Sequence, residues 1–523
     1  MKCPSRLARF MSAMVLVGGM GAPALAQDSP LGIPDPAPIS IPAGSVLDTM
    51  IRAKLHLRQY SVADLTVQQL ADGQVRIPVS LGGEAVTLAL APHSLRGDHF
   101  QVVTIGADGN QVAVEAPPAS TFKGVAGGLE GSRVRASVRD GQVTALVILP
   151  DGGIWGIQPA TAADPEAPAG LHIIFRDSDA EPMNRVCGVL PDAHDHSDEP
   201  QVGGDEGGAL RGTGIKIADI ALDADFEFYG LNGSSVPNTV NDMENVLNNV
   251  EGIYETAVQI TFEITTVVVR TAEPDPYTTT NPGALLGQFQ SWWNTNQALV
   301  RRDYAHLFTG KNIDGGVIGI ASLGVVCNTS NAYGLAQSRF SLNMISRTCL
   351  SAHEMGHNWS AQHCDGPTTC AIMCSVLGGC PGGCQDFSTP ERTQINNHRN
   401  SRTCLLDLRD PVTPAFNDQI LSIDPVRWSF NFGALASSLS VNPPTPPLAL
   451  QLNSSSANPN GNDDLRTNYI HMAGMGTGQL RYHVQHRGVE AGETLTVEVW
   501  TSQVRWQVVN TITSDGIDQT SFT

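Results

Sequence analysis

The chain has 523 residues, 41% of them hydrophobic, and a formal net charge of −20 at pH 7. That length predicts about three domains, and the apolar content is sufficient for well-packed cores, which excludes a disordered chain. The strong negative charge argues against nucleic acid or an anionic membrane surface as a partner.

The first 26 residues have the pattern of a secretory signal peptide. Three basic residues precede an apolar stretch, and the tripeptide Ala-Leu-Ala at 24–26 fits a small-residue cleavage site. The apolar stretch is short and rich in glycine for a membrane anchor, and no later stretch could form a transmembrane helix, so we favour export. The sequence therefore predicts a secreted, extracellular protein without a membrane span.

Residues 27–212 form a β-rich region followed by a linker. A helix is expected over residues 46–57, and valine-rich and leucine-rich runs separated by Gly and Asp turns follow to about residue 180. These runs predict short antiparallel strands. Residues 190–212 are acidic and rich in glycine, which is typical of an exposed linker.

Residues 213–410 have the alternation of strands and helices that is typical of an α/β domain. The stretch 236–257 has helical spacing, with Asn238 or Thr239 as the candidate N-cap of the helix, and a second helix over 281–296 has Pro282 in its first turn. Apolar runs predict buried strands at residues 215–222, 258–270, 304–310 and 315–326.

Three histidines and a glutamate gather in the stretch "HEMGHNWSAQH". In a helix over 351–361, His353 and His357 are four residues apart and share one face, so both imidazoles can bind one zinc ion. Glu354 is one residue on, where it can take a proton from a zinc-bound water and return it to a leaving amine. His363 can complete a three-histidine site only if the chain turns back after the helix. Two helical histidines can also be a packed or solvated pair, but His363, and Met373 shortly after it, favour the metal site.

This stretch resembles the extended metzincin motif, H-E-x-x-H-x-x-G-x-x-H. Residues 353–358 read "HE-x-GHN", which is similar to the helix motif of the reprolysins, or adamalysin-like peptidases. The resemblance covers residues 213–408 and implies an α/β metzincin catalytic domain, with a mixed twisted sheet plus helices, in a secreted and bacterial zinc endopeptidase. It implies that Met373 lies in a Met-turn beneath the histidines as an apolar floor. It also implies that Gly319, Ile320 and Ala321 lie in an edge strand that binds extended substrate.

The same resemblance implies a second, weaker expectation, a structural calcium ion. Asp303 and, less surely, Asp219 match acidic positions that the family uses for calcium. The cofactors expected from the sequence are therefore zinc and, in addition, calcium.

Two residues depart from the family pattern. Ser360 stands where the family has a glycine, at a turn that often needs a positive φ, so either the turn differs or Ser360 is strained. Cys364 follows the third histidine where reprolysins usually have aspartate, and a disulfide there could anchor the same loop.

Eight cysteines crowd between Cys327 and Cys404. In an exported chain an even cluster predicts disulfides, although the spacings Cys370/Cys374 and Cys380/Cys384 would also suit a cysteine-zinc site. The family resemblance implies the pair Cys327–Cys404 and leaves the other six cysteines unassigned.

Cys187 is then left over. Residues 121–159 resemble the reprolysin propeptide, and "NRVCGVLPD" is similar to the cysteine switch of metzincin zymogens, in which a Cys-Gly thiolate occupies the fourth position on zinc. The resemblance thus implies that Cys187 binds zinc in a latent form until the linker is cut, with Arg211 as the obvious basic cleavage point. An unpaired or intermolecularly paired cysteine is the alternative.

Residues 411–523 alternate apolar and polar residues, which predicts a C-terminal β-sandwich, incomplete in this chain. The favoured function is a secreted zinc endopeptidase, made as a zymogen, that acts on protein or peptide substrates. The alternative is a non-catalytic extracellular binding protein that keeps the metzincin fold; the intact Glu354 favours the enzyme. A thermolysin-like site with a glutamate as third ligand is opposed by His363. The oligomeric state is left open.

Overall fold

The computed structural model describes residues 38–522, apart from 191–213, 409–421, 423–427, 453–463, 468–481 and shorter gaps at 72, 184, 299, 366–368, 381–382, 385, 403, 433, 445–446 and 502–504. The expected signal peptide and Arg211 lie outside the described residues. We call residues 38–190 the N-terminal region, 214–405 the central region and 406–522 the C-terminal region. The N-terminal region and most of the central region belong to one compact unit, and the C-terminal region belongs to a second.

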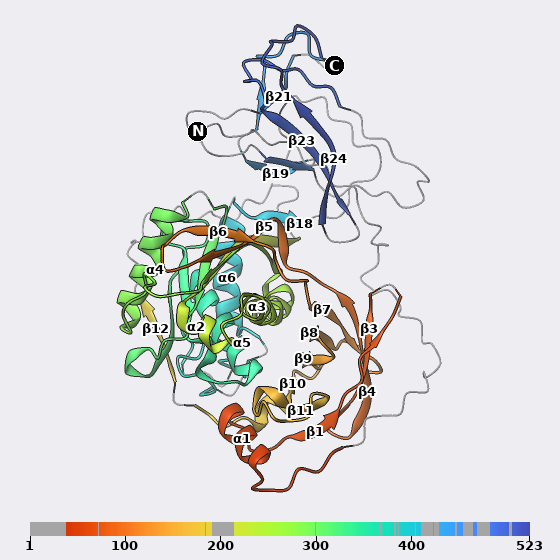
Figure 1. The fold of residues 1–523 in the computed structure, drawn as a ribbon, viewed down its shortest axis with the longest axis vertical. Helices are drawn as coiled ribbons and strands as arrows, with labels where there is room; N and C mark the ends of the chain where they lie inside the picture. The colour runs from red at the N-terminus through yellow and green to blue at the C-terminus, as the bar shows by residue number, and fades with distance from the viewer. Residues whose placement is uncertain are drawn as a thin grey trace. The chain divides into compact units, whose positions relative to one another are not determined.

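The N-terminal region is β-rich, as predicted, and most of it is one nine-stranded antiparallel sheet (Figure 1). The sheet has the order β1-β11-β10-β9-β8-β7-β4-β3-β2. Its strands are β1 Ser61–Asp64, β2 Gln68–Gln69, β3 Val75–Leu81, β4 Glu84–Pro92, β7 Thr121–Ala126, β8 Arg133–Arg139, β9 Gln142–Ile148, β10 Ile154–Pro159 and β11 Leu171–Arg176. Alternate residues face its core, where Ile77 of β3 lies opposite Leu88 of β4 and both are fully buried.

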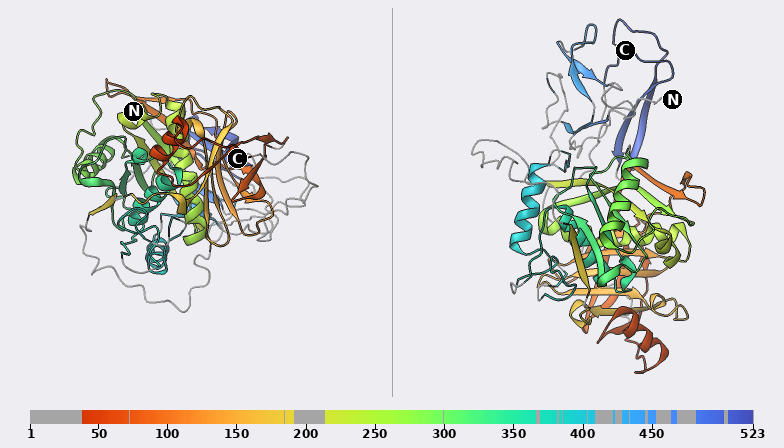
Figure 2. Two further views of the ribbon diagram at one scale, coloured as in Figure 1. Left: turned by 90° about the horizontal axis from the view of Figure 1, so that it is seen from below. Right: turned by 90° about the vertical axis from the view of Figure 1, so that its left-hand side faces the viewer.

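Helix α1 (Val46–Leu55) confirms the first predicted helix and begins after Ser45, whose side chain accepts a hydrogen bond from Asp48 N. Its apolar residues Ile51 and Leu55 pack with Leu146 of β9 and Ile173 of β11. In the right panel of Figure 2 this red helix lies beside the yellow-orange strands of the N-terminal sheet.

The central region is built on a second nine-stranded sheet, which is mixed, as predicted. Its order is β12-β16-β17-β15-β13-β14-β5-β6, with β18 (Leu406–Leu408) paired to the first residues of β13. The central strands are β13 Ile215–Ala224, β14 Ile260–Arg270, β15 Tyr304–Phe308, β16 Val317–Ser322 and β17 Tyr333–Ala336. Strand β15 runs parallel to β13 and β17, whereas β16 is antiparallel to β17.

Both edges of the central sheet are completed by strands of the N-terminal region. Strands β5 (Arg96–Ile105) and β6 (Gln111–Val114) form a hairpin, and β5 pairs parallel with β14. At the opposite edge, β12 (Val186–Leu190) pairs parallel with β16. Residues 100–106 are one of the valine-rich runs that predicted strands in the N-terminal region; the strand exists, but it belongs to the central sheet.

Two helical layers cover the central sheet. Helices α3 (Val236–Val258) and α5 (Met344–Asn358) pack on one core, and α4 (Pro282–Asn296) packs on the other. Helix α3 is seen end-on in Figure 1 between the N-terminal sheet and α5. The remaining helices are α2 Phe226–Leu231, α6 Thr389–Ser401 and the short 3-10 helices η1 Ala160–Ala162, η2 Asp177–Asp179, η4 Asp314–Gly316 and η5 Ser338–Phe340. Within the described part of the chain, none of the helices combines the length and apolar composition that a membrane span requires.

Strand β14 shows why the sheet needs both layers. Val267 and Val269 belong to the core under α3, whereas Val268 belongs to the core under α4. The run of apolar residues that predicted this strand is therefore a strand buried on both faces.

In the C-terminal region the described residues form three antiparallel strand pairs. These are β19 (Trp428–Phe432) with β22 (Asp464–Thr467), β20 (Leu435–Ser437) with β21 (Ala449–Gln451), and β23 (Thr494–Thr501) with β24 (Arg505–Thr513). The pairs confirm the predicted β content, and the complete sandwich stays a prediction.

Candidate metal centre

Helix α5 positions the histidines. It begins after Asn343, whose Oδ1 accepts hydrogen bonds from the backbone N–H groups of Ile345 and Ser346, and it ends at Asn358. It therefore begins seven residues before the predicted helix and ends three residues earlier. All of its residues are buried, so its polar side chains need partners inside the protein.

The turn after α5 brings in the third histidine. The N–H of Ala361 donates to Gly356 O over 2.9 Å, and Ser360 has a φ of 79°. This is the left-handed conformation that the family glycine adopts easily and that costs a serine free energy. The expected turn is therefore present, and it is Ser360 that is strained.

Three imidazole nitrogens meet at one point. His353 Nε2 lies 3.0 Å from His357 Nε2 and 3.2 Å from His363 Nε2. These are the separations of ligands around a tetrahedral zinc ion with Zn–N bonds of about 2.0–2.1 Å, which places ligand nitrogens roughly 3.3 Å apart. The donor set and its spacing therefore fit zinc.

Backbone carbonyls orient two of the rings. His353 Nδ1 lies 2.7 Å from Ile372 O, and His357 Nδ1 lies 2.7 Å from Ala361 O. Each Nδ1 must donate its proton to that carbonyl, which leaves Nε2 with a free lone pair facing the common point. Burial lowers the pKa of His353 to about 4 and the pKa of His357 well below its usual range, so both are neutral, which is the metal-binding form.

Glu354 lies beside this nitrogen cluster and is completely buried. Its Oε2 is 3.4 Å from Cys187 Sγ, and its Oε1 has no hydrogen-bond partner among the described residues. Burial raises the pKa of this carboxyl well above its usual value. Glu354 is thus a buried carboxyl group with one unbonded oxygen next to the candidate zinc site.

Two glycines provide the space for these side chains. A Cβ on Gly319 would come 2.2 Å from Glu354 Oε1, and a Cβ on Gly356 would come 2.6 Å from the sulfur of Met373. Met373 is therefore held against helix α5, buried beneath the residues that carry the histidines. Gly319 was expected only as a substrate-binding residue, and the role of Gly356 was not anticipated.

Asn358 is a positioning residue that the sequence did not single out. Its Nδ2 donates to Ser322 O at 2.9 Å and to Tyr333 O at 3.0 Å. The end of the histidine helix is thereby fixed to strands β16 and β17. Its sequence signal was its place at the end of the stretch "HE-x-GHN", where it was given no role.

Cys187 of the N-terminal region reaches the same point. Its Sγ lies 3.4 Å from His357 Nε2, and its ligand atom and the three histidine nitrogens lie within 4.8 Å of one another. Burial, with the nearby Glu354 carboxylate, raises the pKa of this thiol well above its usual value in the absence of a cation. A coordinated metal ion reverses that preference, because a coordinating thiol is deprotonated.

The expected substrate strand is covered by the strand that carries this cysteine. Cys187, Gly188 and Val189 pair in register with Gly319, Ile320 and Ala321, respectively. The edge of β16 therefore can accept an extended chain, and here that chain belongs to the same polypeptide.

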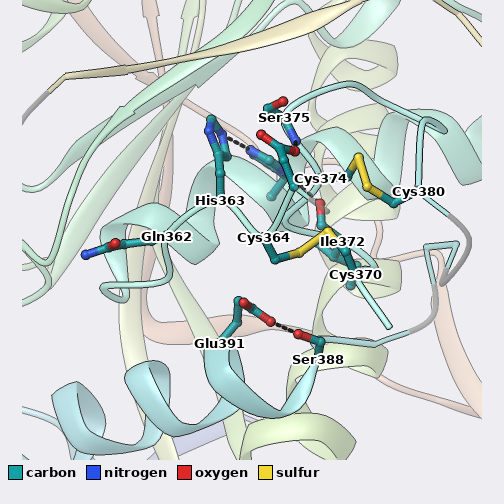
Figure 3. Close-up of a disulfide and its surroundings, with 12 residues drawn as sticks. Gln362, His363, Cys364, Cys370, Ile372, Cys374, Ser375, Cys380, Ser388 and Glu391 are labelled. Carbon is teal, nitrogen blue, oxygen red and sulfur yellow. Dashed lines mark hydrogen bonds between the residues drawn. A yellow bond between two sulfur atoms is a disulfide. The ribbon is translucent and has the colours of Figure 1, made fainter. Parts of the chain in front are cut away.

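Four disulfides link the cysteines of the central region: Cys327–Cys404, Cys349–Cys384, Cys364–Cys370 and Cys374–Cys380. Cys187 is the free cysteine of the described chain. The alternative cysteine-zinc site is wrong, because its four cysteines are all disulfide-bonded. Figure 3 shows the disulfides Cys364–Cys370 and Cys374–Cys380, which close short loops near His363. Cys364 follows the third histidine directly in the sequence.

The expected calcium residues lie apart from this cluster. Asp303 Oδ2 accepts a hydrogen bond of 2.8 Å from Asp219 N, and the Asp219 carboxylate is paired with Arg301. The sulfurs of Cys327 and Cys404 are near Asp303 but are bonded to each other. In this arrangement the negative charge of Asp219 is already balanced by an arginine.

Comparison with known proteins identifies the central region. The family model described as metallo-peptidase family M12 (Reprolysin_5) matches residues 215–398. This chain carries a reprolysin-type M12 metallopeptidase domain. The histidine cluster and Glu354 lie inside the matched M12 domain.

Two curated relatives also match. The disintegrin and metalloproteinase domain-containing protein 19 of Mus musculus is 27% identical over 166 residues, which is 32% of this chain and 18% of that protein. The zinc metalloproteinase recombinant fibrinogenase II of Deinagkistrodon acutus is 33% identical over 94 residues, 18% of this chain and 40% of that protein. The chain thus spans less than half of the length of either relative. Neither relative is bacterial, so the bacterial source expected from the sequence has no support from them.

Proposed function

We propose that this chain is a secreted zinc endopeptidase that is made as a zymogen. The observation that carries the proposal is the buried Glu354, whose Oε1 has no partner beside three converging imidazole nitrogens. His353, His357 and His363 would hold the zinc ion. The signal-peptide pattern and the four disulfides support an oxidising, extracellular destination.

The chemistry follows from the residues around the cluster. Zinc, when bound, is a Lewis acid that lowers the pKa of a coordinated water to about 7. Glu354 Oε1 would accept the proton of the attacking water and deliver it to the leaving amine. The backbone of Gly319–Ala321 would bind the peptide substrate as an added strand, because the same backbone already pairs with residues 187–189.

The test compares Glu354→Ala with the parent after cleavage of the linker. We expect bound zinc, measured by mass spectrometry of metals, to be unchanged, and protein hydrolysis to fall by about 10²–10⁴-fold, because the base is removed and the ligands remain. Glu130→Ala, at an exposed position of the N-terminal region, is the control and should hydrolyse normally. Loss of zinc from Glu354→Ala, or unchanged turnover, contradicts the assigned role. A parent that binds zinc but cleaves no protein favours the non-catalytic binding protein.

Latency is attributed to Cys187. Its Sγ lies next to His357 Nε2, and its strand covers the β16 edge, so both the metal position and the substrate strand are closed. We expect Cys187→Ser to be active, or to mature early, without added protease, because a hydroxyl is a poorer zinc ligand than a thiolate. If the variant is as latent as the parent, the covering strand alone is responsible for latency.

Calcium is a weaker part of the proposal. If Asp303 and Asp219 bind calcium, a calcium-selective chelator should lower the melting temperature. A melting temperature that does not change removes calcium from the proposal.

A further inference from the structure

Strand β14 of the central sheet pairs with strand β5 of the N-terminal region. It pairs with β5 from Thr266 opposite Gln101 to Arg270 opposite Ile105. Beyond the two ends of this ladder, Ile264 N donates to Leu95 O and Thr271 N donates to Ile105 O. Without β5, this strand of the M12 domain would present a row of unpaired backbone groups.

The side chains of β5 also belong to the cores of the M12 domain. Val102 packs in the core under α3, and Val103 and Ile105 pack in the core under α4; all three are buried. The β5–β6 hairpin is therefore part of the central hydrophobic structure as well as part of its sheet. Its departure would expose apolar surface on both faces of β14.

Helix α3 presents a row of polar residues to the N-terminal region. The row recurs every three or four residues, which places its members on one face of the helix. Its members are Asn238, Asn241, Glu244, Asn248, Glu251 and Glu255. Each contacts the N-terminal region through a hydrogen bond or an ion pair.

The strongest of these contacts are buried ion pairs. Arg96 donates to both oxygens of Glu244, at 2.6 and 3.0 Å, and Arg135 Nε donates to Glu251 Oε2 at 3.1 Å. The side chains of Glu244 and Glu251 are 4% and 1% exposed. Separating the two regions would leave both carboxylates without these partners, which is unfavourable for a charge.

The other edge of the sheet is held differently. Strand β12 has five residues, and Val186, Cys187 and Gly188 are only half-buried. Outside its ladder with β16, Cys187 N donates to Ser375 O at 3.0 Å. Its attachment is short and local compared with that of β5 and the face of α3.

We propose that the N-terminal region stays bound to the M12 domain as a separate polypeptide after the linker is cut. The interaction surface is the edge of β14 together with the polar face of α3, and the partner is the β-hairpin and arginine-bearing sheet of this same chain. Opening the site then requires only that β12, at the new C-terminus of the bound fragment, leaves the edge of β16. This inference rests on the proposed zymogen but concerns binding and not catalysis.

The test uses the full chain with a recognition sequence for a site-specific protease inserted between residues 191 and 213. Glu354→Ala is included so that self-digestion cannot occur. After complete cleavage we expect the two fragments to elute together in gel filtration and to give one complex in native mass spectrometry. Amides of β5 should stay protected from hydrogen exchange, while amides of β12 lose protection. Separate elution of the fragments, or loss of protection in β5, overturns the proposal.

Matched variants localise the surface. Arg96→Ala should weaken the complex of the cut fragments at least tenfold. Arg139→Ala should weaken it by a smaller factor, because the hydrogen bond of Arg139 with Asn238 is exposed. This second variant tests the surface even if Arg96→Ala misfolds. Arg58→Ala, on an exposed residue that bonds within the N-terminal region, should leave the affinity unchanged. Equal effects of Arg139→Ala and Arg58→Ala would contradict the assigned surface. The same cut is also made in the protein that retains Glu354. If its fragments stay together but hydrolyse no protein, the proposed function is overturned and this inference stands.

Discussion

The two edges of the central sheet are both completed by parallel strands from the N-terminal region, but the two added strands differ in length, burial and neighbouring charge. At the β14 edge the added strand is ten residues long, its side chains Val102, Val103 and Ile105 are buried, and a charged helix face lies beside it. At the β16 edge the added strand has five residues and a cysteine that faces the histidine cluster. In the proposed zymogen, the same backbone pairing is therefore structural at the β14 edge and regulatory at the β16 edge.

The residues of the two partner strands explain the difference. Val267, Val268 and Val269 of β14 need apolar cover on both faces. In β16, Gly319 leaves space for Glu354, and its backbone pairs with Cys187. In the proposed zymogen, the β14 edge therefore stays covered after cleavage and the β16 edge exchanges its partner.

The largest expected effect is at the β16 edge. Gly319→Ala would place a Cβ 2.2 Å from Glu354 Oε1, so the carboxylate must move. We expect kcat/KM of the cut enzyme to fall by about 100-fold or more, since small displacements of a reacting group have effects of that order. Gly287→Ala in α4, where the new Cβ meets nothing within 4 Å, should have normal activity. A normal kcat/KM for Gly319→Ala would show that Glu354 does not need this space.

The second prediction concerns the charged face beside β14. Burial alone would raise the pKa of Glu251, but the charge of Arg135, with those of His93 and Lys123, holds it below its usual range. Glu255 of α3 and the hydroxyl of Thr261 also face this group. Because the pKa of Glu251 is lower in the folded state than in the unfolded state, its contribution to stability is present above about pH 4.5 and is lost as the pH falls further.

Glu251→Gln should therefore lower the free energy of unfolding at pH 7 by about 3 kcal/mol, because it removes the more deeply buried of the two carboxylates that pair with Arg135. The difference from the parent should shrink as the pH falls from 5 to 3, measured by denaturant unfolding at each pH. Glu130→Gln, at an exposed position, is the control. A difference that is the same at both pH values would contradict the ionised pair.

The third prediction compares the two added strands directly. Val102→Ala in β5 removes two methyl groups from a residue that is 1% exposed and should lower the free energy of unfolding by about 2 kcal/mol. Val186→Ala in β12, at a half-buried position, should cost less than about 0.5 kcal/mol. Denaturant unfolding of the uncut chain measures both. Equal losses would mean that the two edges are held equally.

Local patterns in the sequence predicted individual elements well. Helix α4 begins at Pro282, as expected, and the chain turns after Asn358 to bring His363 to the other histidines. The predicted N-cap of α3 was wrong: the helix begins at Val236, three residues earlier than a cap at Asn238 and four earlier than a cap at Thr239 would give, because Ser235 accepts the hydrogen bond from Asn238 N. Ser and Asn are both good caps, and only the path of the chain decides between them.

Contacts between distant segments could not be predicted in this way. Nothing in the run at 100–106 distinguishes a strand of its own sheet from one that pairs with β14, more than 150 residues away in the chain. The pairing of Cys349 with Cys384 likewise depends on how helix α5 packs, whereas the family resemblance supplied only Cys327–Cys404, which is confirmed. The histidine site was accessible to sequence analysis because its ligands are close together in the chain.

The smallest expected effect is at the turn that ends the histidine helix, on the β16 side of the comparison. The loop after β16 binds the same helix end, since Gly324 N donates to His357 O. Ser360 holds a φ of 79° there, which costs a non-glycine residue about 1–2 kcal/mol. Ser360→Gly removes that cost but adds conformational freedom to the unfolded chain, worth about 0.4–1 kcal/mol in the opposite direction. We expect a net gain of less than about 1 kcal/mol in the free energy of unfolding, with unchanged zinc binding. The control is Ser291→Gly, an exposed position inside helix α4, where the same change should destabilise the protein by about 0.5–1 kcal/mol. A loss of stability at both positions would show that the serine at 360 makes a contact that compensates for its backbone conformation.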